Sequence, residues 1–256
     1  MPDPNRSFAD HFSGHAAAYA RARPGYPAAL FDWLVAEACP GRAPTAAWDC
    51  ATGNGQAALP LADRLDRVYA TDAAAAQLAE LPAHPRVQAA VAPAEDSGLP
   101  DQSVDLVTVA QALHWFRVEA FHAEVRRVLR PGGLLAAWCY QLFAISPAID
   151  AVVWALYEGK VGQDWPPERR ILERAYADLP WPYAPVEAPA FEMEARWDLQ
   201  QTLAYLGTWS AVRRHMARTG VDPVAEIAPA LAAAWGPADQ TRAVRWPVLL
   251  RVGRLR

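Results

Sequence analysis

Short apolar runs alternate with amphipathic stretches through the first half of the chain, and this alternation sets the predicted architecture. Strands are predicted at 46–50, 67–71, 87–92, 104–110 and 134–140. Helices are predicted at 28–39, 56–65, 73–81 and 117–129. Pro60 is expected to kink the second of these helices or to delay its start, because proline lacks the amide hydrogen that a helix interior needs. Strands that alternate with helices through short connections are typical of a parallel sheet covered on both faces.

The pattern changes after residue 140. Residues 141–190 contain one apolar segment and loops rich in proline and aromatic residues, which indicates an insertion packed over the sheet. Residues 191–197 alternate in polarity as a half-buried strand does. The final run, 242–255, is predicted to be a strand in which Pro247 occupies an edge position or a bulge.

Two helices are predicted between these last strands. Asp198 is a candidate N-cap for a helix that runs to about residue 216, because its carboxylate can accept a bond from an unpaired backbone amide. A second helix is predicted at about 222–235 and is expected to be interrupted by Pro229. The chain therefore ends in two strands that follow the fifth and pair with each other.

A glycine turn follows the first predicted strand. Asp49 ends that strand, and Gly53 and Gly55 lack the Cβ atoms that would keep a ligand away from the main chain. The next helix opens with unpaired amides that can donate to a ligand. Asp72 ends the second predicted strand. Strand, glycine turn, helix, strand and acid form the arrangement that holds a nucleoside cofactor, with the second acid on the ribose hydroxyls.

The glycine spacing alone leaves the cofactor open. The run Gly53 to Ala58 fits the G-x-G-x-x-G/A pattern of dinucleotide folds, so a nicotinamide-dependent oxidoreductase is one alternative. Asp49 argues against it, because a carboxylate at the mouth of the turn would repel a pyrophosphate and would suit a cationic or zwitterionic ligand. A protein that binds its cofactor without turnover is the other alternative.

These residues resemble the motifs of class I S-adenosylmethionine-dependent methyltransferases, and specifically of the methyltransferase type 11 group. Asp49 to Gly55 resembles the first motif, acid-x-Gly-x-Gly-x-Gly, with Ala51 in place of the first glycine. Residues 70–72 resemble the second motif, 94–96 the segment that meets adenine, and 104–116 the fourth strand with its loop. Within the group, residues 19–27 and 208–210 are similar to those of small-acid methyltransferases such as trans-aconitate methyltransferase.

The resemblance implies a fold class and a division of the chain. The fold is expected to be α/β, a Rossmann-like, doubly wound seven-stranded sheet, mostly parallel with an antiparallel last strand, plus a helical cap insertion. One domain is expected over 1–256. Its parts are an N-terminal helical lid (1–40), a cofactor-binding core (41–140), a cap insertion (141–190), and strands and helices that complete the sheet (191–256).

The resemblance also implies S-adenosyl-L-methionine as cofactor and a set of residues that bind it. The set is Tyr19, Arg23, Asp49, Ala51, Gly53, Gly55, Asp72, Ala94, Glu95 and Gln111. Asp49 is expected to position the cofactor's ammonium group, directly or through water, and Asp72 the ribose. Tyr19 and Arg23 are expected to close over the cofactor carboxylate. The alternative is that Tyr19 packs in the core and that Arg23 is a solvated charge. A negative φ at Ala51 would let its methyl group be tolerated, so that binding persists. A positive φ would strain the turn and lower the affinity for the cofactor.

His114 is the sole candidate general base, at the carboxyl end of the fourth strand, although a histidine there is more often a shape or hydrogen-bonding residue. Arg213 and Arg214 could attract an anionic acceptor, and a solvated helix face is the favoured alternative. Aromatic residues that could wall a pocket, or pack as core, are Trp165, Trp181, Tyr183, Tyr205 and Trp209.

The composition favours a small-molecule acceptor. The chain has 256 residues and a formal net charge of −4, and it has no run of basic residues longer than a pair, which argues against a nucleic-acid partner. Its three cysteines are too scattered for a disulfide framework or a metal site. No stretch has the pattern of a signal peptide or a membrane span. We expect a cytoplasmic enzyme, without metal or membrane partner, that methylates a carboxylate or hydroxyl oxygen; the sequence does not indicate an oligomeric state.

Overall fold

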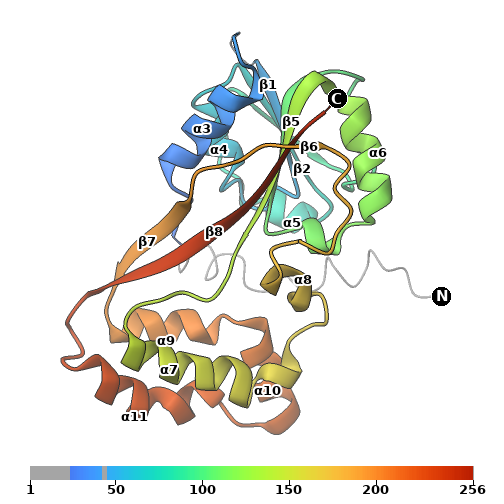
Figure 1. Ribbon diagram of the computed structural model, residues 1–256. Coiled ribbons are helices and arrows are strands. Elements are labelled where there is room, and N and C mark those ends of the chain that lie inside the picture. The colour runs from blue at the N-terminus through green and yellow to red at the C-terminus, as the bar shows by residue number, and fades with distance from the viewer. Residues whose placement is uncertain (1–23, 42–44, 256) are drawn as a thin grey trace.

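One mixed sheet organises the molecule (Figure 1). The computed structural model describes residues 24–41 and 45–255. The strand order is β3-β2-β1-β4-β5-β8-β6, and β7 pairs with β8 off this path. The strands are β1 (Ala46–Cys50), β2 (Arg67–Asp72), β3 (Val87–Val91), β4 (Val104–Ala110), β5 (Leu129–Tyr140), β6 (Ala184–Pro185), β7 (Phe191–Trp197) and β8 (Arg242–Arg254). The strands β1 to β5 pair in parallel, and β8 pairs antiparallel with β5. This confirms the predicted Rossmann-like fold class.

Helices cover both faces of the sheet and form a further layer (Figure 1). The helices of the first part are α3 (Ala28–Ala38), α4 (Ala58–Ala62), α5 (Ala75–Leu78), η1 (Leu113–Trp115) and α6 (Val118–Val128). Those of the second part are α7 (Pro147–Trp154), η2 (Ala155–Lys160), η3 (Gly162–Asp164), α8 (Arg169–Glu173), α9 (Leu199–Gly207), α10 (Ser210–Thr219) and α11 (Pro223–Trp235). Figure 1 shows α7, α9, α10 and α11 gathered beyond the end of the sheet where β5 leads into α7, and α8 between them and the sheet.

The continuous apolar run of β5 contributes to a core on each face of the sheet. Leu134, Ala136 and Trp138 belong to the core that includes α3 and α4, and this core continues into the helical layer. The residues between them, Leu135 and Ala137, belong to the core under α6. Successive side chains of a strand point to opposite faces, so one run of apolar residues serves both. Since parallel strands share one direction, the carboxyl ends of β1, β4 and β5 all meet the same edge, which faces the helical layer (Figure 1).

Several helices differ from the sequence prediction. The predicted helix 56–65 is shorter, and α4 begins at Ala58. Pro60 therefore lies in the first turn, where a missing amide hydrogen is tolerated, which confirms the late start. The predicted helix 73–81 is reduced to the four residues of α5. Pro229 does not interrupt α11, which is a continuous helix of 13 residues with Pro229 inside it.

The predicted helix 198–216 is two helices. Asp198 caps α9 as predicted, and a capping box with Gln201 satisfies both exposed amides. The chain then breaks after Gly207, because Trp209 takes an extended conformation with ψ 134° and α10 begins at Ser210. The break lets the Trp209 ring pack against Tyr157, Trp165 and Tyr205. This packing is a long-range contact that helical periodicity cannot report.

Pro247 lies where β8 is locally an edge strand, as predicted. The pairing of β8 with β5 ends at Val248, opposite Tyr140. The amide of Arg245 donates to Ala144 on the same side, and residues 141–143 between these contacts are off the ladder. The Pro247 nitrogen, which has no hydrogen to donate, lies at this gap, so the sheet loses no hydrogen bond there.

The N-terminal lid predicted for 1–40 falls largely outside the described residues, as do Tyr19 and Arg23, so their predicted roles stay predictions. In the described part of the chain, no helix combines the length and the apolar character that crossing a membrane requires.

Candidate functional site

The glycine turn joins β1 to β2 through backbone hydrogen bonds. The Thr52 amide donates to the Thr71 carbonyl at 2.9 Å, and the Gly53 amide donates to Asp72 Oδ2 at 2.9 Å. The other carboxylate oxygen of Asp72 accepts from the Ala74 amide at 2.8 Å. Burial raises the pKa of Asp72, and these two amides oppose that rise. Asp72 is thus fixed at the carboxyl end of β2, beside the turn.

Ala51 has a φ of +55°, so of the two alternatives that the sequence left open the structure has the strained one. This left-handed conformation costs an alanine roughly 1 kcal/mol more than a glycine, because its Cβ crowds the following carbonyl. The turn keeps the backbone shape that the motif's glycine would adopt, and Ala51 bears the strain.

The two glycines of the turn differ in their surroundings. A Cβ on Gly55 would lie 2.1 Å from Leu81 Cδ1, the end of a flexible side chain that would have to move aside. A Cβ on Gly53 would meet only Gln77 Oε1, at 3.7 Å. Both have positive φ, +57° at Gly53 and +88° at Gly55. Gly53 therefore presents backbone that a ligand can approach, as the sequence analysis predicted for both positions.

Asp49 is buried behind the turn, with 1% of its surface exposed. Its two oxygens accept hydrogen bonds from Thr52 Oγ1 at 2.6 Å and from Thr108 Oγ1 at 2.7 Å. Burial raises the pKa of Asp49 to about 6, the two hydroxyls lower it, and the charge of Asp72 raises it. Asp49 is therefore ionised at neutral pH and is held by the protein's own hydroxyls.

The loop after β4 provides the adjoining wall of the site. Gln111 has a φ of +58°, and its side-chain amide donates to the Tyr140 carbonyl at 3.3 Å. His114 lies in η1, with its ring stacked on Tyr176 at a centroid distance of 6.3 Å. Its Nδ1 is buried and has no hydrogen-bond partner among the described residues. Burial, helped by the charge of Arg169, lowers the pKa of His114 to about 3, so the ring is neutral at physiological pH.

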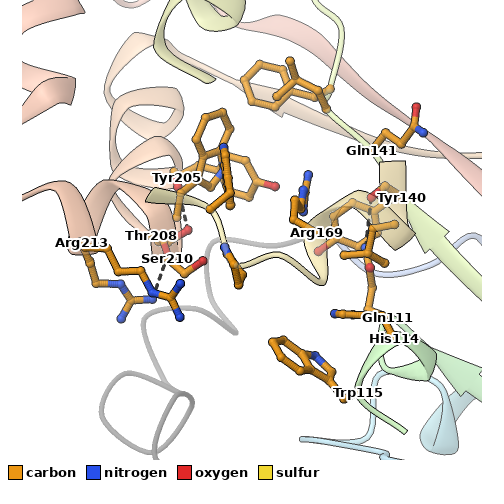
Figure 2. Close-up of a pocket in the computed structure, with 17 residues that line it drawn as sticks. Gln111, His114, Trp115, Tyr140, Gln141, Arg169, Tyr205, Thr208, Ser210 and Arg213 are labelled. Carbon is orange, nitrogen blue, oxygen red and sulfur yellow. Dashed lines mark hydrogen bonds between the residues drawn. The ribbon is translucent and has the colours of Figure 1, made fainter. Parts of the chain in front are cut away.

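A cavity of about 330 Å³ extends from this wall to the helical layer (Figure 2). Its lining comprises Gln111, His114, Trp115, Tyr140, Gln141, Leu142, Phe143, Trp165, Pro166, Arg169, Leu172, Tyr205, Thr208, Trp209, Ser210, Arg213 and Arg214. These residues come from the ends of β4 and β5, from α8 and the loop before it, and from α9 and α10. The cavity has the usual composition of a small-molecule site, an aromatic wall with a few polar groups.

Arg169 is held in the middle of the cavity (Figure 2). Its Nε donates to Tyr157 Oη at 2.9 Å, and Tyr157 in turn donates to Glu173 Oε1 at 2.5 Å. The guanidinium carbon lies 4.8 Å from the centre of the Trp165 ring. A guanidinium stacked on an indole and bonded through Nε leaves its two terminal nitrogens for a ligand.

Arg213 and Arg214 line the cavity from α10, with Arg213 opposite His114 in the view of Figure 2. The Arg213 terminal nitrogen donates to the Thr208 carbonyl at 2.8 Å. Within residues 24–41 and 45–255, none of the cavity's three arginines forms an ion pair, and no carboxylate is among the lining residues. Arg213 and Arg214 are half-buried and line the cavity, so the charged groups of its lining are all positive.

Comparisons with known proteins agree with this geometry. Residues 48–137 match the family model described as "Methyltransferase domain". A solved structure from Anaeromyxobacter dehalogenans, named as a type II methyltransferase, is 52% identical, covers 91% of this chain and 97% of its own, and has a TM-score of 0.85. A Dictyostelium discoideum protein named as a methyltransferase is 29% identical over 93% of this chain and 91% of its own. A geranyl diphosphate C-methyltransferase from Streptomyces coelicolor, solved with S-adenosyl-L-homocysteine, is 14% identical with a TM-score of 0.51, which shows the fold alone.

The chain belongs to the class I S-adenosylmethionine-dependent methyltransferases. It is an enzyme, and its cofactor is S-adenosyl-L-methionine. The residues of the glycine turn fit that cofactor. Each oxygen of Asp72 accepts one backbone amide and keeps a lone pair for a ribose hydroxyl, and Gly53 leaves its backbone open.

Glu95 has a visible partner besides any cofactor contact. Its Oε1 accepts from the Arg117 amide at 2.8 Å, directly before α6. Ala94 beside it is buried. The roles predicted for Ala94, Glu95 and Gln111 in binding the cofactor of this methyltransferase stay predictions, as do those of Asp49, Asp72 and the glycines.

Sequence reasoning missed several polar residues of the methyltransferase site. Thr52 and Thr108, which hold Asp49, and Arg169, at the centre of the cavity, were not singled out. The local sequence of Arg169 has no motif that indicates a binding role; its one distinguishing feature is that it follows Trp165 and two prolines. Of the five aromatic residues considered, Trp165, Tyr205 and Trp209 line the cavity, whereas Trp181 and Tyr183 pack against His122.

Proposed function

We propose that the methyltransferase transfers the methyl group to a carboxylate oxygen of a small organic acid. The observation that supports this proposal is the cavity at the carboxyl ends of β4 and β5, which three arginines line and to which no described residue contributes a carboxylate. Arginine binds carboxylates through two parallel hydrogen bonds, and an aromatic wall excludes water around them.

The state of His114 favours a carboxylate over a hydroxyl acceptor. A hydroxyl must lose its proton during the transfer and therefore needs a base. His114 is the only candidate base that the sequence offered, and with a pKa of about 3 it is too weak to hold a proton at neutral pH. A carboxylate is already ionised at that pH and needs no base. In this proposal His114 shapes and hydrogen-bonds the acceptor site.

The reaction then requires positioning alone. The cofactor supplies an electrophilic methyl group on a sulfonium. A carboxylate oxygen forms the bond to the methyl carbon, the electrons of the carbon–sulfur bond return to sulfur, and no proton is released. Arg169 is held by Tyr157 and Trp165, so it can orient the carboxylate without first losing conformational freedom. The aromatic residues around it keep out water.

The remaining predictions extend the proposal to the whole chain. We propose that 1–40 acts as a lid, 41–140 as the cofactor core, 141–190 as a cap and 191–256 as the completion of one domain. The acceptor is a small molecule and not a nucleic acid, in keeping with the net charge of −4. No feature of the structure or of the comparisons favours the nicotinamide oxidoreductase or the silent cofactor-binding protein.

The test is a panel of matched acids and alcohols. Aromatic, aliphatic and tricarboxylic acids are each incubated with the protein and S-adenosylmethionine beside the alcohol of the same skeleton, and S-adenosylhomocysteine release is measured. We expect turnover with one or more acids and a product that mild alkali hydrolyses to methanol, as a methyl ester does. Arg169→Gln should lower kcat/KM for that acid at least tenfold, through loss of a charge-assisted hydrogen bond. Turnover of alcohols alone, with an alkali-stable ether product, would contradict the proposal.

A further inference from the structure

We propose that Thr108 and Thr52 are positioning residues for cofactor binding, and that they act through Asp49 to fix the glycine turn. Thr108 tethers the turn from β4, the strand whose end also carries the acceptor wall. The inference rests on the cofactor alone and holds whichever acceptor the enzyme uses.

The geometry places all three side chains in one buried cluster. Asp49 on β1 and Thr108 on β4 are direct partners in the register of neighbouring parallel strands. Thr108 Oγ1 donates to Asp49 Oδ1 at 2.7 Å, and Thr52 Oγ1 donates to Oδ2 at 2.6 Å. The exposed fractions are 1% for Asp49, 0% for Thr108 and 7% for Thr52. Each carboxylate oxygen therefore has one hydroxyl donor in a site closed to bulk water.

The cluster restrains the part of the turn that carries strain. Ala51, with φ +55°, lies between Asp49 and Thr52 and would relax to a negative φ if Thr52 were free to move. Thr52 is held twice, by its hydroxyl on Asp49 and by its amide on the Thr71 carbonyl. The next residue, Gly53, donates its amide to Asp72, the predicted ribose ligand. Loss of the Asp49 contacts would thus release the turn and change the place of the Gly53 amide against Asp72.

The tether also connects the two halves of the site. β4 ends at Ala110, and Gln111 and His114, which line the acceptor cavity, follow it. Thr108 lies two residues before that end, so its bond to Asp49 adds a side-chain tie to the β1–β4 ladder between the cofactor turn and the acceptor wall. An aligned transfer depends on the distance between the turn and the wall, because the acceptor oxygen must lie about 3–3.5 Å from the methyl carbon.

The two hydroxyls also keep Asp49 ionised. They and the Ala58 backbone amide favour the carboxylate, whereas burial and the charge of Asp72 oppose it. The Cys50 thiol is the neighbouring titratable group on β1, and burial raises its pKa so that it stays uncharged. Without the Thr108 hydroxyl, the pKa of Asp49 rises further. As the pH is lowered, cofactor affinity should therefore begin to fall at a higher pH in the variant than in the wild-type enzyme. In the wild-type enzyme we expect this fall near pH 6.

The experiment is isothermal titration of the full-length protein with S-adenosylhomocysteine from pH 5.5 to 8.5, with no acceptor present. Thr108→Val keeps the shape of the side chain and removes the hydroxyl, so Kd should increase about tenfold at pH 7 and its pH profile should move to higher pH. Thr108→Ser keeps the hydroxyl and should restore both. Thr202→Val is the matched control, because Thr202 is equally buried, on α9, and away from the turn.

A folded Thr108→Val protein with wild-type Kd throughout this pH range would overturn the proposal, and so would failure of Thr108→Ser to restore binding. If Thr108→Val does not fold, Thr52→Val removes the other hydroxyl and decides the question by the same measurement. A wild-type protein that binds S-adenosylhomocysteine but methylates no acid would refute only the acceptor proposal.

Discussion

At the scale of single residues, two positions that follow central strands have a backbone conformation that their residue types rarely adopt. Ala51 and Gln111 both have a positive φ, one after β1 and the other after β4, the two strands at the centre of the sheet. Neither residue type predicts that conformation, because alanine and glutamine rarely adopt it. Strain of this kind concentrates at functional sites, where the surrounding structure over-determines the backbone. The predicted motif located both positions, and only the structure showed their geometry.

Replacement of Ala51 by glycine should stabilise the protein. Glycine adopts a φ of +55° without the steric cost, so Ala51→Gly should raise the free energy of unfolding by about 1 kcal/mol. Thermal unfolding should show an increase in Tm of roughly 2 °C. Ala123→Gly on the exposed side of α6 is the control of opposite sign, because glycine in a helix interior costs about 1 kcal/mol. A lower Tm for Ala51→Gly would show that the turn is not strained there.

Asp72 should affect cofactor binding in two ways, as the predicted ribose ligand and as the acceptor that holds two backbone amides. Asp72→Ala removes the predicted ribose ligand and the acceptor of the Gly53 and Ala74 amides, so affinity for S-adenosylhomocysteine should fall by about 1–3 kcal/mol. Calorimetry measures this directly. Asp101→Ala, which removes an exposed carboxylate paired with Arg127, is the control and should bind as the wild type does. Equal affinities in the two variants would refute the role of Asp72.

At the scale of elements, the cavity depends on how two distant segments are tied together. Asp164 ends η3, immediately before Trp165, and its carboxylate accepts from Arg218 Nε at 2.8 Å and from His215 Nδ1 at 3.0 Å. Both donors lie on α10, the helix that also carries Arg213. The Asp164 contacts thus hold the loop of Trp165 and the helix of Arg213 against each other. Helix periodicity predicted α10 only as the end of a longer helix and gave no sign of this contact.

Loss of the Asp164 carboxylate should loosen this wall selectively. In Asp164→Ala, amides of residues 161–169 and 210–219 should exchange with deuterium faster than in the wild type, because the bonds that join the segments are gone. Exchange in β1, β4 and β5 should not change. Asp178→Ala, which removes an exposed partner of Arg174, is the matched control. Faster exchange throughout the sheet would show instead that Asp164 supports the whole fold.

At the scale of the whole molecule, the enzyme tolerates a cost in stability to hold an ionised Asp49. Its pKa of about 6 in the folded protein lies above the value of 3.8 in an unfolded chain. Below pH 3.8 both states are protonated and Asp49 contributes nothing; between pH 3.8 and 6 the unfolded chain ionises first, so stability falls as the pH rises. Above pH 6 the cost is complete, at roughly 3 kcal/mol.

Asp49→Asn should therefore change the pH dependence of stability. Asparagine does not titrate, so the free energy of unfolding of the variant minus that of the wild type should increase between pH 4 and pH 6.5 and stay level above it, by an amount on the order of 2–3 kcal/mol. Urea unfolding at several pH values measures the difference. A difference that does not vary with pH would show that Asp49 has an ordinary pKa.

The sequence by itself determined the order of strands and helices as far as β5, the strands near 191–197 and 242–255, the cap at Asp198 and the motif from Asp49 to Asp72. These features rest on local signals, namely the alternation of apolar positions, capping residues and glycines at fixed spacing. Only the tertiary structure decided the φ of Ala51, the break between α9 and α10, and the convergence of Arg169, Arg213 and Arg214 on one cavity. The reason is physical: each of these depends on contacts between segments far apart in the chain, and the packing of the helical layer against the sheet selects them over any local preference.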